Sequence, residues 1–262
     1  MDKNLYLKNI SFSYQGSNQR ILQNIDTQIN NGEFVCLLGQ SGSGKSTLLR
    51  LLAGLEKPTV GSICLDDEEV LGPSLNRGMV FQDYGLFPWM KIGENLVIAF
   101  KQKYPDKSKV ELEKLAYEMI DAVGLDKAVY NKFPKELSGG MQQRCAIAQT
   151  FGINPSILLM DEPFGALDAV TRARLQELVL ELWLSEKEKK TVVFVTHDVD
   201  EAIFLANRII VLGQSPAHII YDVKVEKDEN YKRENQFENH KILELRNELI
   251  NQINMDVLSR VD

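Results

Sequence analysis

A glycine-rich segment early in the chain carries the residue types that bind phosphate. It matches the pattern G-x-x-x-x-G-K-[ST] and consists of Gly39, Gln40, Ser41, Gly42, Ser43, Gly44, Lys45 and Ser46, with Thr47 next. Glycines tolerate dihedral angles that other residues resist, so backbone N–H groups can point at phosphate oxygens. Lys45 would contact the β- and γ-phosphates and Ser46 would ligate Mg²⁺. This segment, the P-loop, predicts a nucleoside triphosphate site.

The residues around the P-loop supply the secondary structure that such a site requires. The apolar run Phe34–Leu38 predicts a buried strand before it, and residues 46–55 show a helical pattern after it. The positive end of that helix would face the anion. A chance glycine-rich turn is therefore the weaker interpretation.

Two carboxylates follow a second buried strand. The strand is predicted at Ile157–Asp161, so that Asp161 ends it and Glu162 comes next. A carboxylate at a strand end can help to hold Mg²⁺, and a carboxylate beside the γ-phosphate can take a proton from water. An Asp-Glu pair is common in solvated turns, but four apolar residues precede this one on a chain with a P-loop. We therefore predict that Asp161 binds metal and that Glu162 is the general base.

A second potential anion site combines a serine with two glycines. Ser138, Gly139 and Gly140, the serine–glycine segment, lie in the run LSGGMQQR and precede a helical pattern over residues 141–151. A hydroxyl and glycine amides at a helix N-terminus can bind an anion. A serine there is also an ordinary helix N-cap, but the whole run is too specific for capping to be the preferred interpretation.

The P-loop, the serine–glycine segment, Asp161-Glu162 and His197, in this order, resemble the nucleotide-binding subunit of ATP-binding-cassette (ABC) transporters. The resemblance covers residues from about 5 to 222. It implies that the serine–glycine segment caps ATP held by a neighbouring copy. A head-to-tail dimer with composite sites is therefore expected.

The same resemblance assigns roles to four more residues. Gln82 would touch Mg²⁺ and the attacking water, and Asp168 would link the two sites across the dimer. His197 would contact the γ-phosphate, although a lone histidine at a strand end is more often structural. Tyr14 would stack on adenine, with an ordinary strand aromatic as the alternative.

Two residues depart from the family pattern in the helix after the serine–glycine segment. Gln149 stands where many relatives carry arginine, and Cys145 stands where a small aliphatic residue is usual. Neither belongs to the expected chemistry, so we expect intact ATPase function.

Strand–helix alternation predicts an α/β fold with a P-loop NTPase core and a mostly parallel sheet. Period-two spacing over residues 5–14 adds an antiparallel β subdomain. Helical patterns over about residues 83–155 predict an inserted helical lobe, with a capping box at Ser108 and Glu111. We predict an ATPase domain over 1–222 and a C-terminal helical tail over 223–262. The tail would pack back on the domain or, as the less favoured alternative, meet a partner.

The predicted helices carry two apolar stripes. The tail stripe consists of Ile242, Leu245, Leu249 and Ile253. The lobe stripe consists of Val110, Leu112, Leu115, Met119 and Val123, with Gly124 as a helix stop.

The composition of the chain narrows the kinds of function that the protein could have. The chain has 262 residues, 44% of them hydrophobic, which suffices for a substantial core. Its net charge of −7 argues against nucleic acid as the main partner. Cys36, Cys64 and Cys145 lack metal-ligand spacing and are expected to be free buried thiols in a reducing compartment. We also expect no secretory signal and no membrane-spanning segment.

Two segments, 76–89 and 160–172, look like those of importers of nitrate, taurine and aliphatic sulfonates. This resemblance implies uptake of a small anionic solute through integral membrane permease subunits, at the cytoplasmic face of the membrane. A periplasmic or lipid-anchored solute-binding protein would take part indirectly. The stretch Leu86–Trp89 would receive a helix of the membrane subunit; alternatively, Phe87 and Trp89 belong to the lobe core.

Two other classes of cassette protein fit this sequence less well. Soluble cassette ATPases of DNA repair insert long heptad coiled coils, and the insert here lacks sustained heptads. Translation versions carry two cassettes, whereas this chain carries one. A non-catalytic regulatory cassette would have lost catalytic residues, yet Lys45, Asp161, Glu162 and His197 are present.

Overall fold

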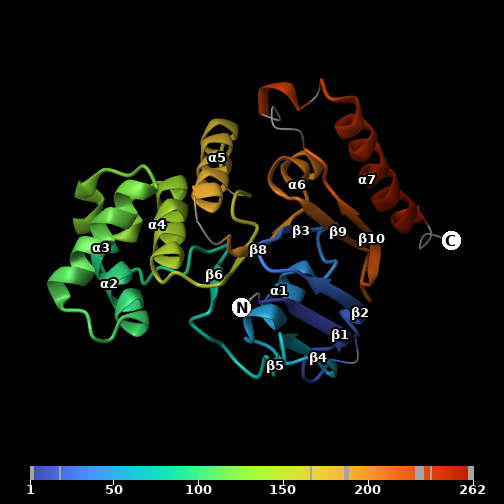
Figure 1. The fold of residues 1–262 in the computed structure, drawn as a ribbon, viewed down its shortest axis with the longest axis horizontal. Coiled ribbons are helices and arrows are strands. Elements are labelled where there is room, and N and C mark those ends of the chain that lie inside the picture. Colours follow the sequence, from blue (N-terminus) through green and yellow to red (C-terminus); the bar gives the residue numbers. More distant parts are fainter. Residues whose placement is uncertain are drawn as a thin grey trace. The chain divides into compact units, whose positions relative to one another are not determined.

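The computed structural model describes residues 3–17, 19–165, 167–185, 189–227, 233–236 and 238–258. It divides into two compact units (Figure 1). The first unit comprises Met1–Pro73 together with Thr191–Asp262, and the second comprises Ser74–Lys190. The predicted helical lobe falls within the second unit, which also contains two strands and a further helix.

The first unit begins with the predicted antiparallel subdomain. Its sheet has the order β2-β1-β4-β5, and β1 pairs antiparallel with both β2 and β4. Leu5, which is fully buried, lies opposite Ile29 on one side and Leu65 on the other. The strands are β1 (Leu5–Phe12), β2 (Leu22–Ile29), β4 (Val60–Leu65) and β5 (Glu68–Glu69).

The parallel strands of the first unit hold its core. β3 lies between β8 and β9 and is parallel to both, while β10 is antiparallel to β9. Every residue of β3 and β8 is buried, which fits the continuous apolar runs in their sequences. The strands are β3 (Phe34–Leu38), β8 (Thr191–Thr196), β9 (Arg208–Leu212) and β10 (Ile219–Lys224). The first three were predicted, but β10 lacks a buried apolar run and was missed.

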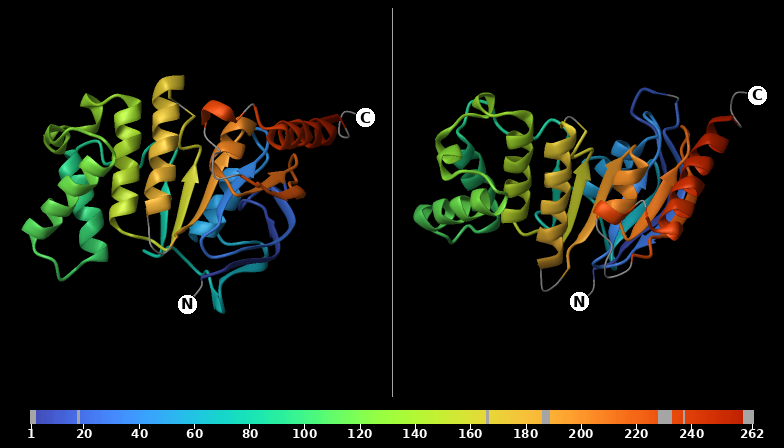
Figure 2. Two further views of the ribbon diagram at one scale, coloured as in Figure 1. Left: turned by 45° about the horizontal axis from the view of Figure 1, so that its top comes forward. Right: turned by 90° about the horizontal axis from the view of Figure 1, so that it is seen from above.

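The helices of the first unit are α1 (Lys45–Ala53), α6 (Val199–Leu205) and α7 (His240–Leu258), with a short 3-10 helix, η3 (Arg233–Asn235). Gly54 ends α1 in the left-handed conformation, where an added Cβ would collide with the Gly72 carbonyl oxygen. The predicted tail forms α7, which packs on α6 and β10 (Figure 2). Ile242 and Leu249 are buried, which confirms the tail's packing on the domain. Tail residues 228–232, 237 and 259–262 lie outside the described residues.

An unpredicted arginine links the strands of the first unit. Arg208 of β9 forms a bidentate pair with Asp222 of β10, at 2.8 and 2.7 Å. Its guanidinium also donates to Glu33 at 3.2 Å and to Thr27 of β2 at 3.0 Å. The hydrogen bonds and negative charge of Asp222, with a smaller effect of Glu33, raise the pKa of Arg208, so it stays charged. The arginine therefore joins the antiparallel sheet to the parallel strands.

The second unit combines a parallel strand pair with helices. β6 (Arg77–Val80) pairs with β7 (Ile157–Asp161), whose residues are all buried. α4 and α5 lie side by side (Figure 2). The helices are α2 (Ile92–Lys103), α3 (Lys109–Ala122), α4 (Gly139–Gly152) and α5 (Ala169–Ser185), with 3-10 helices η1 (Lys127–Asn131) and η2 (Pro134–Glu136).

The capping box at the start of α3 is confirmed. Ser108 Oγ accepts from the Glu111 amide at 3.3 Å, and the Glu111 carboxylate accepts from the Ser108 amide at 2.8 Å. The predicted stripe needs correction, because Val110 is 74% exposed. The buried positions are Leu112, Ala116, Ile120 and Val123, spaced by the three or four residues of one helix face.

Within the described ranges, none of the helices combines the length and the apolar composition that a membrane span requires.

Candidate nucleotide-binding site

The P-loop connects β3 to α1 and needs its glycines for two reasons. Gly42 and Gly44 both have φ of 81°, in the left-handed region that favours glycine. Gly39 has no room for a side chain, because an added Cβ would lie 2.6 Å from the Leu212 carbonyl oxygen. Gly44 is the N-cap of α1, so the loop ends at the positive end of a helix. The backbone geometry suits an anion.

Lys45 lies within the P-loop and is only 4% exposed. Its Nζ donates to the carbonyl oxygens of Gly39 at 2.9 Å and Gln40 at 2.6 Å, and to Ser43 Oγ at 3.3 Å. These contacts satisfy the buried ammonium group and hold it against the loop. An ammonium group, backbone amides and a helix N-terminus together can bind the phosphates of a nucleotide.

Tyr14 lies beside the P-loop. Its hydroxyl is 3.2 Å from Thr47 Oγ1, and its ring makes an edge contact with Phe12 at a centroid distance of 4.8 Å. Tyr14 is 38% exposed, so part of this residue is accessible to a ligand. Tyr14 can therefore stack on a base.

His197 is brought next to the P-loop by strand register. Leu38 pairs with Thr196 in the parallel β3–β8 ladder, so Gly39 and His197 are the next residues on each strand. Both line one pocket of about 500 Å³, together with Gln40 and Ser41. The first unit thus gathers Tyr14, the P-loop and His197.

The second unit gathers Gln82, Asp161 and Glu162 in a similar way. Val80 pairs with Met160 in the parallel β6–β7 ladder, so Gln82 and Glu162 each lie two residues beyond a paired position. Asp161 is the buried last residue of β7. Glu162 has φ of 44°, a conformation that non-glycine residues adopt at a cost of order 1 kcal/mol. Such strain is characteristic of functional sites.

The serine–glycine segment forms the start of α4. Exposed Ser138 is the N-cap, and its Oγ accepts from the Met141 amide at 3.4 Å. An added Cβ would lie 2.9 Å from the Tyr84 hydroxyl at Gly139 and 2.7 Å from the Thr171 methyl at Gly140. The glycines therefore also allow Tyr84 and Thr171 to pack closely against the start of α4. The sequence pattern did not reveal this role.

Asp168 lies before α5 and accepts from the amides of Val170 at 3.1 Å and Thr171 at 3.0 Å. Hydrogen bonds from Thr171 lower the pKa of this carboxyl group. Asp168 is therefore an ionised, exposed helix cap.

The three cysteines are free thiols. Burial raises the pKa of Cys145 to about 12 and raises that of Cys36 well above its ordinary value, so both are poor nucleophiles. Cys64 is only partly buried, which corrects the expectation of three buried thiols. Gln149 lies in α4.

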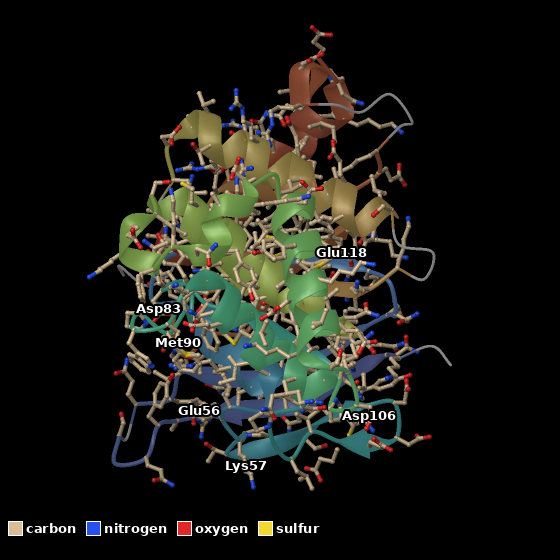
Figure 3. All side chains as sticks on the ribbon, turned by 90° about the vertical axis from the view of Figure 1, so that its left-hand side faces the viewer. Glu56, Lys57, Asp83, Met90, Asp106 and Glu118 are labelled. Carbon is tan, nitrogen blue, oxygen red and sulfur yellow. The ribbon has the colours of Figure 1, made fainter. Side chains whose placement is uncertain are left out.

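Phe87 and Trp89 lie on the surface, and their assignment to the lobe core is wrong. Phe87 is 42% exposed and Trp89 is 72% exposed, with ring centroids 5.4 Å apart. Figure 3 labels Asp83 and Met90, which precede and follow these two residues in the chain. The two rings form an exposed apolar patch, which we call the Phe87–Trp89 patch.

Asn95 holds the patch and was missed in the sequence. Its Oδ1 accepts from the Phe87 amide at 2.7 Å, and its Nδ2 donates to the carbonyl oxygens of Phe87, Met90 and Lys91 at 3.2, 3.2 and 3.0 Å. Asn95 is 1% exposed. A polar residue on the buried face of α2, beside Ile92 and Leu96, was the available signal.

Comparison with known proteins gives the family. The ABC transporter family model matches residues 22–165. The chain belongs to the ABC transporter family. An aliphatic sulfonates import ATP-binding protein of Bacillus thuringiensis subsp. konkukian is 46% identical over 210 residues, covering 79% of this chain and 80% of that protein. A nitrate import ATP-binding protein of Synechocystis sp. is 48% identical over 198 residues, covering 76% of this chain and 73% of that protein.

Solved structures confirm the fold of this ABC protein. A dimeric post-hydrolysis state of an ATP-binding cassette, bound to ADP and Pi, matches with a TM-score of 0.76 and 34% identity. The match covers 86% of this chain and all of that chain. The predicted α/β P-loop fold is confirmed, and the chain is an ATPase of the ABC family.

Proposed function

We propose that this ABC ATPase energises uptake of a small anionic solute of the nitrate, sulfonate or taurine type. The main support is the identity of 46–48% to proteins named for import of aliphatic sulfonates and nitrate. The chain itself would not touch the solute, which passes through partner membrane subunits. Neither the DNA-repair nor the translation alternative finds support in these relatives.

ATP binding falls to the first unit. Tyr14 stacks on adenine, and the P-loop from Gly39 to Thr47 surrounds the phosphates with its amides. Lys45 supplies the positive charge, and Ser46 supplies a hydroxyl ligand for Mg²⁺. The left-handed glycines and the buried ammonium group support these roles.

Hydrolysis requires the carboxylates of the second unit. Asp161 and Gln82 would hold Mg²⁺ together with Ser46, and the metal would offset phosphate charge when bound. Glu162 accepts a proton from the attacking water, and His197 donates a hydrogen bond to the γ-phosphate. The buried strand before Asp161 and the strained backbone of Glu162 support these roles.

A second copy completes each site in this proposal. Ser138, Gly139 and Gly140 of one copy cap ATP on the P-loop of the other, and Asp168 links the two sites in a head-to-tail dimer. The dimeric neighbour bound to ADP and Pi supports this assembly. ATP binding then favours the closed dimer and hydrolysis reverses the preference, which is a population shift.

The Phe87–Trp89 patch is the proposed contact with the integral membrane subunits, at the cytoplasmic face of the membrane. A hollow of about 510 Å³ begins at Met90 and Lys91 and continues between α2 and α3. Exposed aromatic rings beside a hollow suit an inserted helix. A periplasmic or lipid-anchored solute-binding protein would act indirectly, through the membrane subunits.

Isolation of the tagged protein from native membranes tests the proposal. We expect two integral membrane subunits to co-purify with the wild type and to be lost when Phe87→Ala and Trp89→Ala are combined. Val110→Ala is the control, because Val110 is an apolar residue of the same unit that is at least as exposed as Phe87 and Trp89. A ribosome or a DNA-repair complex as the main co-purifying species would contradict an importer.

A further inference from the structure

The C-terminal helix α7 is attached by hydrogen bonds at two places to the part of the first unit that contains the P-loop and His197. At its N-terminal half, Arg246 Nε donates to Asp200 Oδ1 at 2.6 Å, with a second contact from Nη2 to Oδ2 at 3.4 Å. Asp200 lies in the first turn of α6, three residues after His197. Near its C-terminal end, Asp256 Oδ2 accepts from the Gln214 amide at 2.7 Å.

The second contact continues to the P-loop. Gln214 Nε2 donates to Gln40 Oε1 at 3.2 Å. Asp256 also approaches Gly213 so closely that an added Cβ there would lie 2.8 Å from Asp256 Oδ1. A chain of three hydrogen-bonded residues, Asp256, Gln214 and Gln40, therefore connects α7 to the phosphate loop.

Between these two attachments, α7 forms a wall of the pocket at the P-loop. Ile250, Ile253 and Asn254 line this pocket of about 500 Å³ opposite Gln40, Ser41 and His197. Leu249, one residue before them, is fully buried and anchors the helix. α7 thus reaches the same cavity as the residues proposed to contact the γ-phosphate.

We infer that α7 is a positioning element for ATP hydrolysis, in which Arg246 and Asp256 fix the His197 turn and the edge of the P-loop. The inference rests on the proposed roles of the P-loop and His197. Neither Arg246 nor Asp256 is among the residues that line the pocket at the P-loop. Arg246 therefore acts through Asp200, and Asp256 acts through Gln214 and Gln40.

The expected effect is on turnover more than on affinity. The P-loop fixes most of its own shape through left-handed glycines and Lys45, so ATP would still bind without α7's contacts. Hydrolysis is more sensitive, because small displacements of groups around the reacting phosphate cost large factors in rate. Loosening the His197 turn should therefore lower kcat and leave KM nearly unchanged.

The test measures ATP turnover and ATP affinity in the full chain carrying Arg246→Ala. We expect kcat to fall about tenfold and the dissociation constant for ATP to stay within about twofold. Arg246→Lys, which keeps the charge, should recover part of the rate. Lys241→Ala is the control: it removes a basic residue of α7 whose exposed ion pair with Glu226, at 3.8 Å, lies on the solvent side.

A mutant cycle separates positioning from stability. If Arg246 acts through Asp200, Asp200→Ala should lower kcat equally, and the double variant should lose no more than either single variant. Asp256→Ala should lower kcat independently, through the contact with Gln214 and Gln40. Asp256→Asn, which keeps an acceptor oxygen, should lower kcat less than Asp256→Ala does. The inference would be overturned if the losses of kcat in Arg246→Ala and Asp200→Ala multiplied in the double variant. A lowered unfolding midpoint with an unchanged kcat would also overturn it.

The proposed function can fail separately. Absence of ATP turnover in both the wild type and Lys241→Ala would contradict the ATPase roles of the P-loop and His197, and the inference with them. Normal turnover in these two proteins and in Arg246→Ala would contradict the role of α7 alone.

Discussion

The P-loop and the serine–glycine segment place serine and glycine at the start of a helix in two different ways. In the P-loop, Gly44 begins α1 with φ of 81°, and the buried Lys45 ammonium group lies against the loop. In the serine–glycine segment, Ser138 begins α4 in an extended conformation and caps it with its hydroxyl. Ser138 is exposed, whereas Ser43 and Lys45 are buried.

This difference indicates a division of labour. The P-loop has a fixed backbone and its own positive charge, so it can hold a nucleotide by itself. The serine–glycine segment is a capped helix start with an exposed serine, so in the proposed dimer it suits a phosphate presented by another surface. Substitution in the P-loop should therefore weaken ATP binding as well as hydrolysis, whereas substitution in the serine–glycine segment should reduce hydrolysis and leave ATP binding nearly unchanged.

Lys45→Ala should give the largest effect. Loss of the ammonium group removes the charge that the phosphates require, so we expect ATP affinity to fall at least about tenfold and hydrolysis about 10³-fold. Isothermal calorimetry and phosphate release measure the two quantities. Arg50→Ala, which removes an exposed basic residue of the same helix, should change neither. Normal ATP binding by Lys45→Ala would remove the distinction between the two segments.

Ser138→Arg should strongly reduce hydrolysis with little effect on ATP binding. The bulky side chain would block the α4 N-terminus, and we expect about a 10²-fold loss of phosphate release with ATP affinity within about twofold. Ser138→Ala removes only the cap and should have a much smaller effect. Weakened ATP binding by isolated Ser138→Arg subunits would show that this segment helps to hold the subunit's own nucleotide.

Glycine substitutions sharpen the comparison at the level of stability. Gly42→Ala meets open space and should cost about 1–2 kcal/mol for its left-handed backbone alone. Gly44→Ala should cost more, because its Cβ would also lie 2.8 Å from Leu22 Cδ2. Gly140→Ala is strained only by the Thr171 methyl, so adding Thr171→Ser should rescue it. Urea unfolding measures the free energy of unfolding of each variant. Full rescue of Gly44→Ala by a smaller residue at position 22 would show that its cost does not come from the left-handed backbone.

Asp168→Ala should have the smallest effect. Hydrogen bonds from Thr171 keep the pKa of Asp168 lower in the folded than in the unfolded protein. Its contribution to stability is therefore present above the unfolded pKa of about 4 and lost as pH falls through the folded value. The difference in unfolding midpoint between the wild type and Asp168→Ala should shrink between pH 6 and pH 3.

Most of the fold could be predicted because its strands are continuous apolar runs. β3, β7, β8 and β9 match the predicted ranges, since each buries nearly every side chain. The P-loop and the α3 capping box follow from local residue types, and the structure shows both. Parallel register then explains why His197 lies beside Gly39.

The missed features depend on contacts between residues distant in sequence. β10 exposes much of its surface and is defined by pairing with β9. Asn95 gains its role only when α2 meets the turn at Phe87, and Arg208 only when strands of two sheets converge. The attachment of α7 through Arg246 and Asp256 is likewise invisible in the periodicity of the tail.

Mixed dimers test most directly whether the two segments act on ATP from different copies. Lys45→Ala and Ser138→Arg subunits are each expected to be inactive alone. In a mixed dimer, one composite site carries both defects and the other carries neither, so we predict that ATP hydrolysis reappears on mixing. A mixture no more active than its two parents, with mixed dimers present, would contradict sites shared between copies.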